Sequence, residues 1–173
     1  MPGLRLACPP SRLPFPAMHV SLREVRADDL PFFFEHQRDP EAARLAAFPS
    51  REHEAFTAHW RKVLADAKNA CRTILADGAV AGNIGAWTDA DDRLVSYWIG
   101  REFWGRGVAT AALREFLLIE PARPLTARVA RHNLGSLRVL QKCGFAVLGD
   151  HSCPAPKGDA VAEWVLSLPP PAG

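Results

Sequence analysis

The stretch from Val95 to Glu120 constrains the fold more than any other, because a strand pattern, a glycine pair and a helix pattern follow one another without a break. Residues Val95 to Gly100 are mostly β-branched or aromatic, which predicts a strand. Gly105 and Gly107 then lead into a segment whose apolar residues recur at helical spacing. These residues are Ala109, Ala112, Leu113, Phe116 and Leu117. A glycine loop before a helix leaves backbone N–H groups unpaired at the positive end of the helix dipole, so the stretch predicts a site for an anion such as phosphate.

Two common phosphate loops do not fit this stretch. A Walker A loop ends in Gly-Lys-Ser or Gly-Lys-Thr, whereas Gly107 is followed by Val108. A dinucleotide-binding loop needs a third glycine at the position of Thr110. The segment Trp104–Ala109 instead resembles the acyl-CoA loop of the GNAT N-acetyltransferases, written Gln/Arg-x-x-Gly-x-Gly/Ala. Trp104 stands where that pattern has Gln or Arg, and after Tyr97-Trp98-Ile99 this substitution looks like the RimJ/RimL branch of the family.

A second motif lies downstream, in the stretch from Arg131 to Phe145. It is similar to the family's other signature, Asn-x-x-Ser followed by a helix that ends in Gly-Phe, with Asn133, Ser136 and Gly144 at the matching positions. The two motifs occur in the family's order, with a strand-like segment at residues 125–130 between them. The resemblance implies an α/β fold in which helices flank a mixed, mostly antiparallel central sheet.

Composition limits the domain organisation and the class of partner. A chain of 173 residues with 48% apolar and 23% charged residues is typical of one soluble globular domain. The formal net charge of +2 and the absence of a long basic run argue against nucleic-acid or membrane partners. The four cysteines are scattered without a C-x-x-C pair, which is typical of a reduced, cytoplasmic protein.

The two ends differ in composition from the rest of the chain. Met1–Ala17 contains five prolines and lacks the continuous apolar run of a signal peptide, and the globular pattern begins at His19. We therefore predict that residues 1–18 are a disordered or mis-called leader. Residues 19–168 are predicted to form a single acetyltransferase domain, and the proline-rich residues 169–173 a loose tail.

Periodicity and turn residues predict the remaining elements. A helix capped by Asp28 or Asp29, and another that starts at Asp39-Pro40, are expected after a first strand. Asp77-Gly78 predicts a tight hairpin turn, and Gly144 a left-handed helix end. The predicted order is strand 20–25, three helices within 28–67, strands 71–75, 80–87 and 95–100, the helix after the glycine loop, strand 125–130, a helix from residue 133, and strands near 145–148 and 161–168.

The resemblance implies that the chain transfers an acetyl group from acetyl-CoA to an amine by direct attack. In the family, backbone N–H groups of the loop bind the pyrophosphate, and the end of the preceding strand holds the pantetheine arm. Asn133 matches a family residue that contacts CoA, although asparagine is also a favoured helix cap. The implied acetyl-CoA site comprises Ile99, Gly100, Arg101, Gly105, Arg106, Gly107, Val108, Ala109, Thr110 and Asn133. A solvent-exposed loop arginine is a nearly equal alternative for Arg106.

The proton donor is where this chain departs from part of the family. Many GNAT enzymes carry a tyrosine seven residues after the signature asparagine, where this chain has Leu140. In the RimJ/RimL branch the proposed donor is the signature serine, which makes Ser136 the candidate catalytic residue. A plain helix-start serine is the alternative. The only tyrosine of the chain, Tyr97, is predicted to pack in the core.

No general base can be identified from the sequence. The position at which the branch often has glutamate is Leu94, and the other candidates are each well explained as solvated residues; they are Glu52, His53, Glu54, Asp91 and Asp92. A lysine amine is neutral at pH 7 in only about 0.04% of molecules, against roughly 10% for an α-amine. The predicted acceptor is therefore a primary amine of low pKa: a peptide N-terminus, an amino acid or another small amine.

Several alternatives stay open. The absent tyrosine and glutamate leave room for a non-catalytic acyl-CoA sensor, and the sequence does not exclude a longer acyl donor. His53 and His59 lie six residues apart, on different faces of a regular helix, so no metal site is predicted. Homodimers are frequent in the family, and the oligomeric state stays open.

Overall fold

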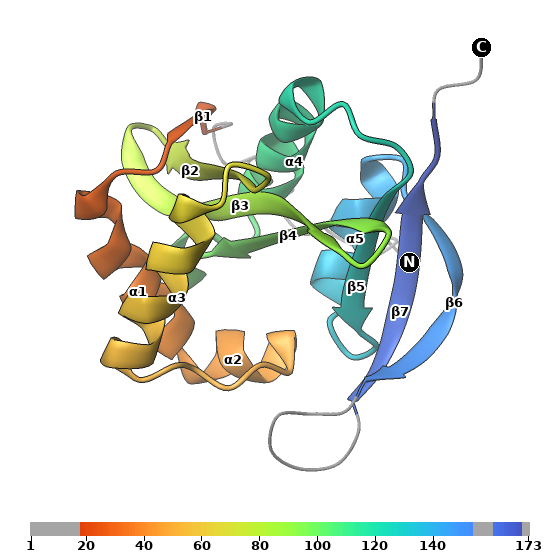
Figure 1. Ribbon diagram of the computed structural model, residues 1–173, viewed down its shortest axis with the longest axis horizontal. Coiled ribbons are helices and arrows are strands. Elements are labelled where there is room, and N and C mark those ends of the chain that lie inside the picture. The colour runs from red at the N-terminus through yellow and green to blue at the C-terminus, as the bar shows by residue number, and fades with distance from the viewer. Residues whose placement is uncertain (1–17, 154–160, 171–173) are drawn as a thin grey trace, which may run out of the picture.

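A seven-stranded sheet forms the centre of the protein in the computed structural model, which describes residues 18–153 and 161–170 (Figure 1). The strands are β1 (Val20–Glu24), β2 (Ala70–Ala76), β3 (Ala79–Asp89), β4 (Asp92–Ile99), β5 (Leu125–Ala130), β6 (Ala146–Cys153) and β7 (Val161–Leu168). Their order across the sheet is β1-β2-β3-β4-β5-β7-β6, and neighbours are antiparallel except β4 and β5. The predicted mixed, mostly antiparallel sheet is confirmed. The predicted leader up to residue 17 and the end of the predicted tail lie outside the described residues.

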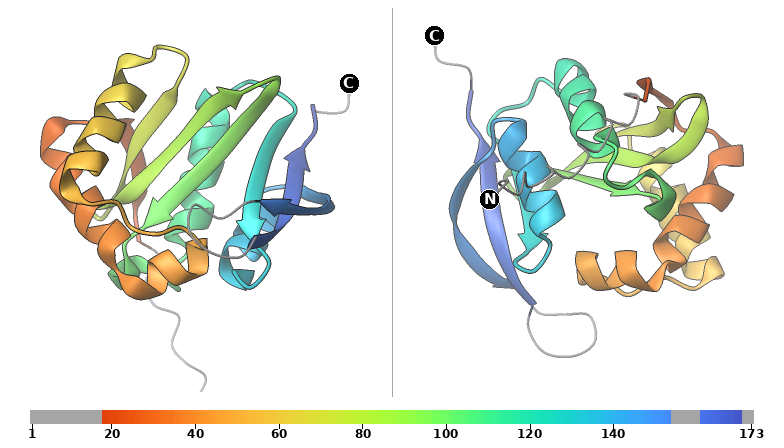
Figure 2. Two further views of the ribbon diagram at one scale, coloured as in Figure 1. Left: turned by 60° about the horizontal axis from the view of Figure 1, so that its bottom comes forward. Right: turned by 180° about the vertical axis from the view of Figure 1, so that it is seen from behind.

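Five α-helices of the described residues cover the sheet. They are α1 (Leu30–Arg38), α2 (Pro40–Ala46), α3 (His53–Ala65), α4 (Val108–Ile119) and α5 (Leu134–Lys142), with 3-10 turns at Ala27–Asp29 and Arg101–Phe103. α1 and α3 lie on one face of the sheet, and α4 and α5 lie on the other (Figure 2). In the part of the chain that the structure describes, no helix is long and apolar enough to cross a membrane.

The parallel strands β4 and β5 separate from one another along their length. Within the described residues a single pair, Leu94 and Thr126, joins them. By contrast, β4 pairs with β3, and β5 with β7, along the whole strand. The C-terminal parts of β4 and β5 therefore diverge (Figure 2). The glycine loop that follows β4 and the helix that follows β5 both start at this divergence.

The apolar faces predicted from periodicity form the core on both sides of the sheet. In α4, Ala112, Leu113 and Phe116 are fully buried, which confirms the predicted helical stripe. On the opposite face, Phe56 and Trp60 of α3 form a second cluster with a phenylalanine of α1. The helices α1 and α4 thus pack against opposite faces of β3 and β4, and this packing holds the end of β4 from which the glycine loop leaves.

Predicted turn and cap residues take the expected conformations. Asp77 and Gly78 have φ angles of 49° and 83°, as a two-residue Asp-Gly hairpin requires. The Asp39 carboxylate accepts a hydrogen bond from the Ala42 N–H (2.9 Å) and caps α2. These local signals were specific because each residue supplies a backbone conformation or an acceptor that few others can.

The C-terminal ends of two helices show one confirmed prediction and one difference. Gly144 has a φ of 91° after α5, and the Phe145 N–H bonds back to the Leu140 carbonyl (3.1 Å), as in a Schellman end. The helix α3 ends at Ala65, so the predicted apolar stripe extends past it to Ala67. The N–H of residue 68 instead bonds to the Asp66 carboxylate (2.9 Å), which turns the chain toward β2.

Asp29, predicted as a helix cap, occupies the N-cap position of α1 but makes no capping hydrogen bond to that helix. Its buried carboxylate accepts hydrogen bonds from the Arg23 guanidinium (2.6 and 2.7 Å), the Thr73 hydroxyl (2.6 Å) and the Arg26 N–H (2.8 Å). These contacts join β1, β2 and the start of α1. Burial alone would raise the pKa of Asp29, but the hydrogen bonds from Arg23, Thr73 and Arg26 outweigh it and lower the pKa to about 2.

We expect Asp29→Asn to reduce the free energy of unfolding by about 2–4 kcal/mol at pH 7, because it leaves the Arg23 guanidinium without its counter-charge. The folded pKa lies below the unfolded value of about 3.9, so the carboxylate stabilises the fold above that pH and loses its effect as the pH falls toward about 2. Urea unfolding between pH 5 and pH 2 should show this loss in the parent and not in the variant. Asp28→Asn, at the exposed neighbouring residue, is the matched control. Equal pH dependence in parent and Asp29→Asn would contradict the assignment.

Candidate functional site

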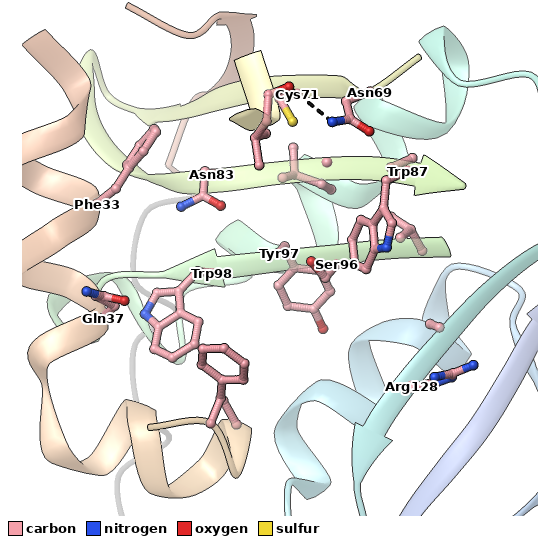
Figure 3. A pocket seen from close by; sticks show the side chains of 18 of the residues that line it. Phe33, Gln37, Asn69, Cys71, Asn83, Trp87, Ser96, Tyr97, Trp98 and Arg128 are labelled. Atoms are coloured by element: carbon pink, nitrogen blue, oxygen red, sulfur yellow. Dashed lines mark hydrogen bonds between the residues drawn. The ribbon is translucent and has the colours of Figure 1, made fainter. Parts of the chain in front are cut away.

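Two cavities meet where β4 and β5 diverge. The first, here called the loop cavity, has a volume of about 410 Å³ and lies among the end of β4, the glycine loop and the first turns of α4 and α5. The second, here called the aromatic cavity, has a volume of about 790 Å³ and lies against β3, β4, β5 and α3 (Figure 3). Five residues line both cavities: Ala46, Tyr97, Trp98, Asn133 and Ser136. Ligands in the two cavities would therefore meet at these five residues.

The glycine loop presents unpaired N–H groups at the N-terminus of α4. Gly105 (φ 72°) and Gly107 (φ 79°) lie in the left-handed region, and Gly107 is the N-cap of α4. A Cβ built at either glycine would meet no atom within 4 Å, so the loop borders open space. No described residue accepts a hydrogen bond from the N–H groups of residues 105–110. Unpaired donors at a helix N-terminus fit the phosphate site that the sequence predicts.

Trp104, which departs from the Gln/Arg of the loop signature, has a structural contact. Its indole N–H donates a hydrogen bond to the Ile99 carbonyl (2.8 Å) at the end of β4. The loop is thereby tied to the strand that precedes it. Such a tie fixes the direction of the loop N–H groups before any ligand arrives, which reduces the ordering cost of binding.

Most of the residues predicted to bind acetyl-CoA line the loop cavity. They are Ile99, Gly105, Gly107, Val108, Ala109, Thr110 and Asn133. Gly100, Arg101 and Arg106 do not line it. The Gly100 N–H donates to the Ala81 carbonyl (2.9 Å). The Arg101 guanidinium lies 3.4 Å from the Asp39 carboxylate, and that of Arg106 lies 3.7 Å from the Met18 sulfur. Binding roles for these three residues stay predictions.

The start of α5 contributes the two residues of the second signature. The Asn133 side-chain oxygen accepts a hydrogen bond from the Ser136 N–H (3.0 Å), so Asn133 caps the helix. No described residue bonds the amide nitrogen of Asn133, which therefore stays available to a ligand. The contact of Asn133 with CoA stays a prediction beside its confirmed role as a cap.

The hydroxyl groups of Tyr97 and Ser136 lie 2.7 Å apart. The ring of Tyr97 packs against the core, as predicted, but its hydroxyl reaches the space between β4 and β5 (Figure 3). Burial raises the pKa of Tyr97 to about 12, and the hydrogen bond with Ser136 opposes this only partly. Tyr97 therefore remains protonated at neutral pH. The prediction of pure core packing missed this hydroxyl pair, because only the divergence of the strands brings residues 97 and 136 together.

The aromatic cavity combines apolar walls with a few ionisable groups. Its aromatic walls come from Phe33, Phe48, Phe56, Trp60, Trp87 and Trp98, and its ionisable residues include Arg51, His59, Asp66, Arg128 and Glu163. Burial lowers the pKa of His59, and the positive charges of Arg51 and Lys62 lower it further. Glu163 pairs with Ala130 at the end of β5, close to the start of α5. Arg51, His59 and Glu163 are partly buried, whereas Asp66 and Arg128 are exposed, so the cavity combines apolar walls with a few polar groups, as small-molecule sites do.

Comparison with known proteins gives the family of the chain. Residues 19–146 match the family model described as an acetyltransferase (GNAT) domain. The chain belongs to the GNAT acetyltransferase family. A search among curated proteins finds no match to the chain.

Solved GNAT structures share the fold. RimL, a ribosomal-protein α-N-acetyltransferase in complex with coenzyme A, has 15% sequence identity and a TM-score of 0.75, over 89% of this chain and 96% of that chain. Spermidine N-acetyltransferase from Vibrio cholerae, in complex with CoA and spermine, has 15% identity and a TM-score of 0.72, over 86% and 95%. A putative acetyltransferase has 26% identity and a TM-score of 0.67, over 88% and 86%.

At two positions where GNAT enzymes often carry a catalytic side chain, this chain has a buried core leucine. Leu140, at the tyrosine position, is 2% exposed, and Leu94, at the glutamate position, is 5% exposed. The base candidates considered from the sequence line neither cavity; they are Glu52, His53, Glu54, Asp91 and Asp92. Arg51 and Glu163 do line the aromatic cavity, although neither residue was predicted from the sequence. No motif marks either residue, and only the packing of α3, β5 and β7 around the cavity identifies them.

Proposed function

We propose that this GNAT domain is an acetyl-CoA-dependent N-acetyltransferase that acts on a primary amine. The observation that carries the proposal is the meeting of two cavities at Tyr97 and Ser136. One cavity borders a phosphate-type glycine loop, and the other has the apolar walls of a small-molecule site. The CoA bound in the RimL and spermidine N-acetyltransferase structures supports the assignment of the loop cavity to acetyl-CoA.

Each group of the site has a separate role in binding or proton transfer. The N–H groups of the glycine loop hold the pyrophosphate, and Asn133 contributes its free amide nitrogen. Acetyl-CoA supplies the acetyl group as a thioester. As the amine nitrogen forms its bond to the acetyl carbon and the carbon–sulfur bond breaks, the Ser136 hydroxyl gives its proton to the leaving sulfur, so that CoA departs as the thiol. Ser136 then regains a proton from solvent before the next turnover. The Tyr97 hydroxyl, bonded to Ser136, orients that hydroxyl and stabilises the charge it develops.

The proton lost by the amine needs an acceptor in the aromatic cavity. Two carboxylates line it, Asp66 and Glu163. Asp66 accepts the N–H of residue 68 at the end of α3 (2.9 Å) and is committed to that turn. Glu163 lies beside the end of β5, and its carboxylate makes no hydrogen bond to a described residue, so we assign it this role. Because a carboxylate is only a weak base, an amine of low pKa, which is partly neutral at pH 7, is the favoured acceptor.

Thermal unfolding with and without acetyl-CoA tests the proposal. Ligand at about 100 times its dissociation constant stabilises a fold by about 2.7 kcal/mol, which for a domain of this size raises Tm by roughly 5–10 °C. We expect this rise with acetyl-CoA and not with ATP. Release of free thiol in the presence of a panel of amines then separates an enzyme from a sensor, and longer acyl-CoA donors test the acyl group. No rise at millimolar acetyl-CoA would overturn the proposal.

A further inference from the structure

Arg51, in the wall of the aromatic cavity, is positioned both at its backbone and at its guanidinium group. It lies in the segment between α2 and α3, where the buried Gln37 side chain donates to its carbonyl (2.9 Å) and accepts from its N–H (3.3 Å). Its guanidinium lies over the Phe48 ring, 4.5 Å from the centroid. Gln37 and Trp98 mark this end of the cavity in Figure 3. The backbone and the head group of Arg51 are therefore both positioned.

The charge of Arg51 has no counter-charge in the described part of the chain. Among the other partly buried arginines, Arg23 pairs with Asp29 (2.6 Å) and Arg93 with Glu120 (2.5 Å). Arg123 has no carboxylate partner either, but its guanidinium donates to backbone carbonyls, whereas no described residue accepts a hydrogen bond from the Arg51 guanidinium. No described carboxylate lies within ion-pair distance of the Arg51 guanidinium. Burial lowers the pKa of Arg51, yet a guanidinium stays charged at neutral pH. A cation without a counter-charge is costly to remove from water, unless a ligand supplies an anion to pair with it.

The opposite side of the cavity carries the complementary charge. Glu163 of β7 pairs with the last residue of β5, and Arg51 lies in the segment between α2 and α3. Figure 1 shows that this segment and β5 lie on either side of the divergence of β4 and β5. Aromatic side chains line the space between them. The cavity therefore has the Glu163 carboxylate on its β5–β7 side, where Arg128 also lines it, and the Arg51 guanidinium on its α2–α3 side, with aromatic side chains among its walls. This order of groups matches an amine at one end of an apolar molecule and an anion at the other.

We propose that the amine acceptor also carries a carboxylate, which Arg51 binds through its guanidinium, so that the substrate is an amino acid or short peptide with an apolar side chain. The inference rests on the proposed function, because it concerns the acceptor of that same reaction. Planar guanidinium and carboxylate groups form paired charge-assisted hydrogen bonds, which gives direction as well as affinity. Polyamines, which lack an anion, would leave Arg51 unpaired and are poor acceptors on this basis.

The test compares each acid with its own amide in parent and Arg51→Gln. The substrates are L-phenylalanine and L-phenylalaninamide, together with the dipeptide Gly-Phe and its amide to vary the distance between amine and carboxylate. For each protein the ratio of kcat/KM for acid over amide is measured, and differences in amine basicity cancel between the two proteins. We expect Arg51→Gln to lower this ratio about 10- to 100-fold for one acid–amide pair or both, while kcat/KM for the amides changes less than about threefold.

Two variants serve as controls. Arg61→Gln removes the same charge from an exposed position of α3 outside both cavities and should leave the ratio unchanged. Arg128→Gln removes the other arginine of the aromatic cavity. An unchanged ratio in Arg51→Gln for both pairs, or a loss confined to Arg128→Gln, would overturn the proposal. Thermal unfolding of each variant without ligand checks that the fold persists.

A second readout needs no turnover. In the presence of CoA, N-acetyl-L-phenylalanine, the product of the proposed reaction, should raise Tm of the parent and not of Arg51→Gln, and its amide should have the smaller effect in the parent. If N-acetyl-L-phenylalanine raises Tm but no amine is acetylated, the carboxylate site is supported and the proposed enzyme activity is excluded. Acetylation of the amides alone, without protection by the N-acetyl acid, would keep the enzyme and sink the carboxylate site. If the protein shows neither acetyl transfer nor thermal protection, both the proposed enzyme and the proposed carboxylate site are excluded.

Discussion

Gly107→Asp is expected to weaken acetyl-CoA binding at least about 100-fold, because a carboxylate would replace open space in front of N–H groups that suit phosphate. The residue is the N-cap of α4, so its side chain would bond the first N–H groups of the helix itself. The same donors could not then serve a pyrophosphate. Calorimetric titration with acetyl-CoA measures the loss directly, and the Tm rise caused by the ligand should disappear with it.

The backbone cost of this substitution must be separated from its effect on the ligand. Gly107 has a φ of 79°, where an L-residue costs about 1–2 kcal/mol. Gly78 offers a matched control: its φ is 83°, a Cβ there also meets no atom within 4 Å, and it lies in the hairpin between β2 and β3. Gly78→Asp carries the same backbone cost without new hydrogen bonds to a helix N-terminus, so it should lower Tm at least as much and leave acetyl-CoA affinity unchanged.

The contribution of charge can be isolated at the same position. Gly107→Asn has nearly the same size and backbone demand as Gly107→Asp, but no negative charge. We expect it to bind acetyl-CoA more weakly than the parent and more tightly than the aspartate variant. If Gly107→Asp binds acetyl-CoA as tightly as the parent does, the glycine loop is not part of the binding site, because the added carboxylate would then neither block nor repel the ligand.

Local chemistry explains which parts of the fold could be predicted from the sequence. Asp77-Gly78 and Asp39-Pro40 act on their own backbone, so their turn and cap did not depend on distant contacts. The stripe of α4 is equally local, because burial of Phe116 and its neighbours follows from helical spacing alone. Asp29 failed as a predicted capping side chain because two strands, reached through Arg23 and Thr73, outcompete the helix for its carboxylate.

The candidate site was predictable only on its loop side. The glycine loop and Ser136 belong to continuous motifs, whereas the walls of the aromatic cavity come from segments more than a hundred residues apart, as Arg51 and Glu163 show. Periodicity gives Tyr97 a buried face of β4 but cannot reveal that β4 parts from β5 beside it. Long-range placement of single side chains is a property of the assembled sheet, so it requires the structure.

The second large effect is expected at the hydroxyl pair. Ser136→Ala should lower kcat about 100-fold or more, because it removes the proton donor for the leaving sulfur, while acetyl-CoA affinity changes less than about threefold. Ser21→Ala, in β1 at the far edge of the sheet, removes the same hydroxyl outside both cavities and should leave kcat unchanged. Steady-state kinetics and calorimetric titration of the same preparations measure the two quantities. Full turnover of Ser136→Ala would exclude it as the donor.

Tyr97→Phe decides how the two hydroxyls share the proton. If Tyr97 acts through Ser136, the phenylalanine variant should lose only about tenfold in kcat, and the double variant should be no worse than Ser136→Ala, because residues of one unit are not additive. The pKa of about 12 keeps the phenol protonated, so the parent should show no loss of rate from this group up to about pH 10. A greater loss in Tyr97→Phe than in Ser136→Ala would instead make the tyrosine the donor and the serine its support. In that case the protein would use a tyrosine from β4 for the step that part of its family performs with a tyrosine on the helix, at the position that Leu140 fills here.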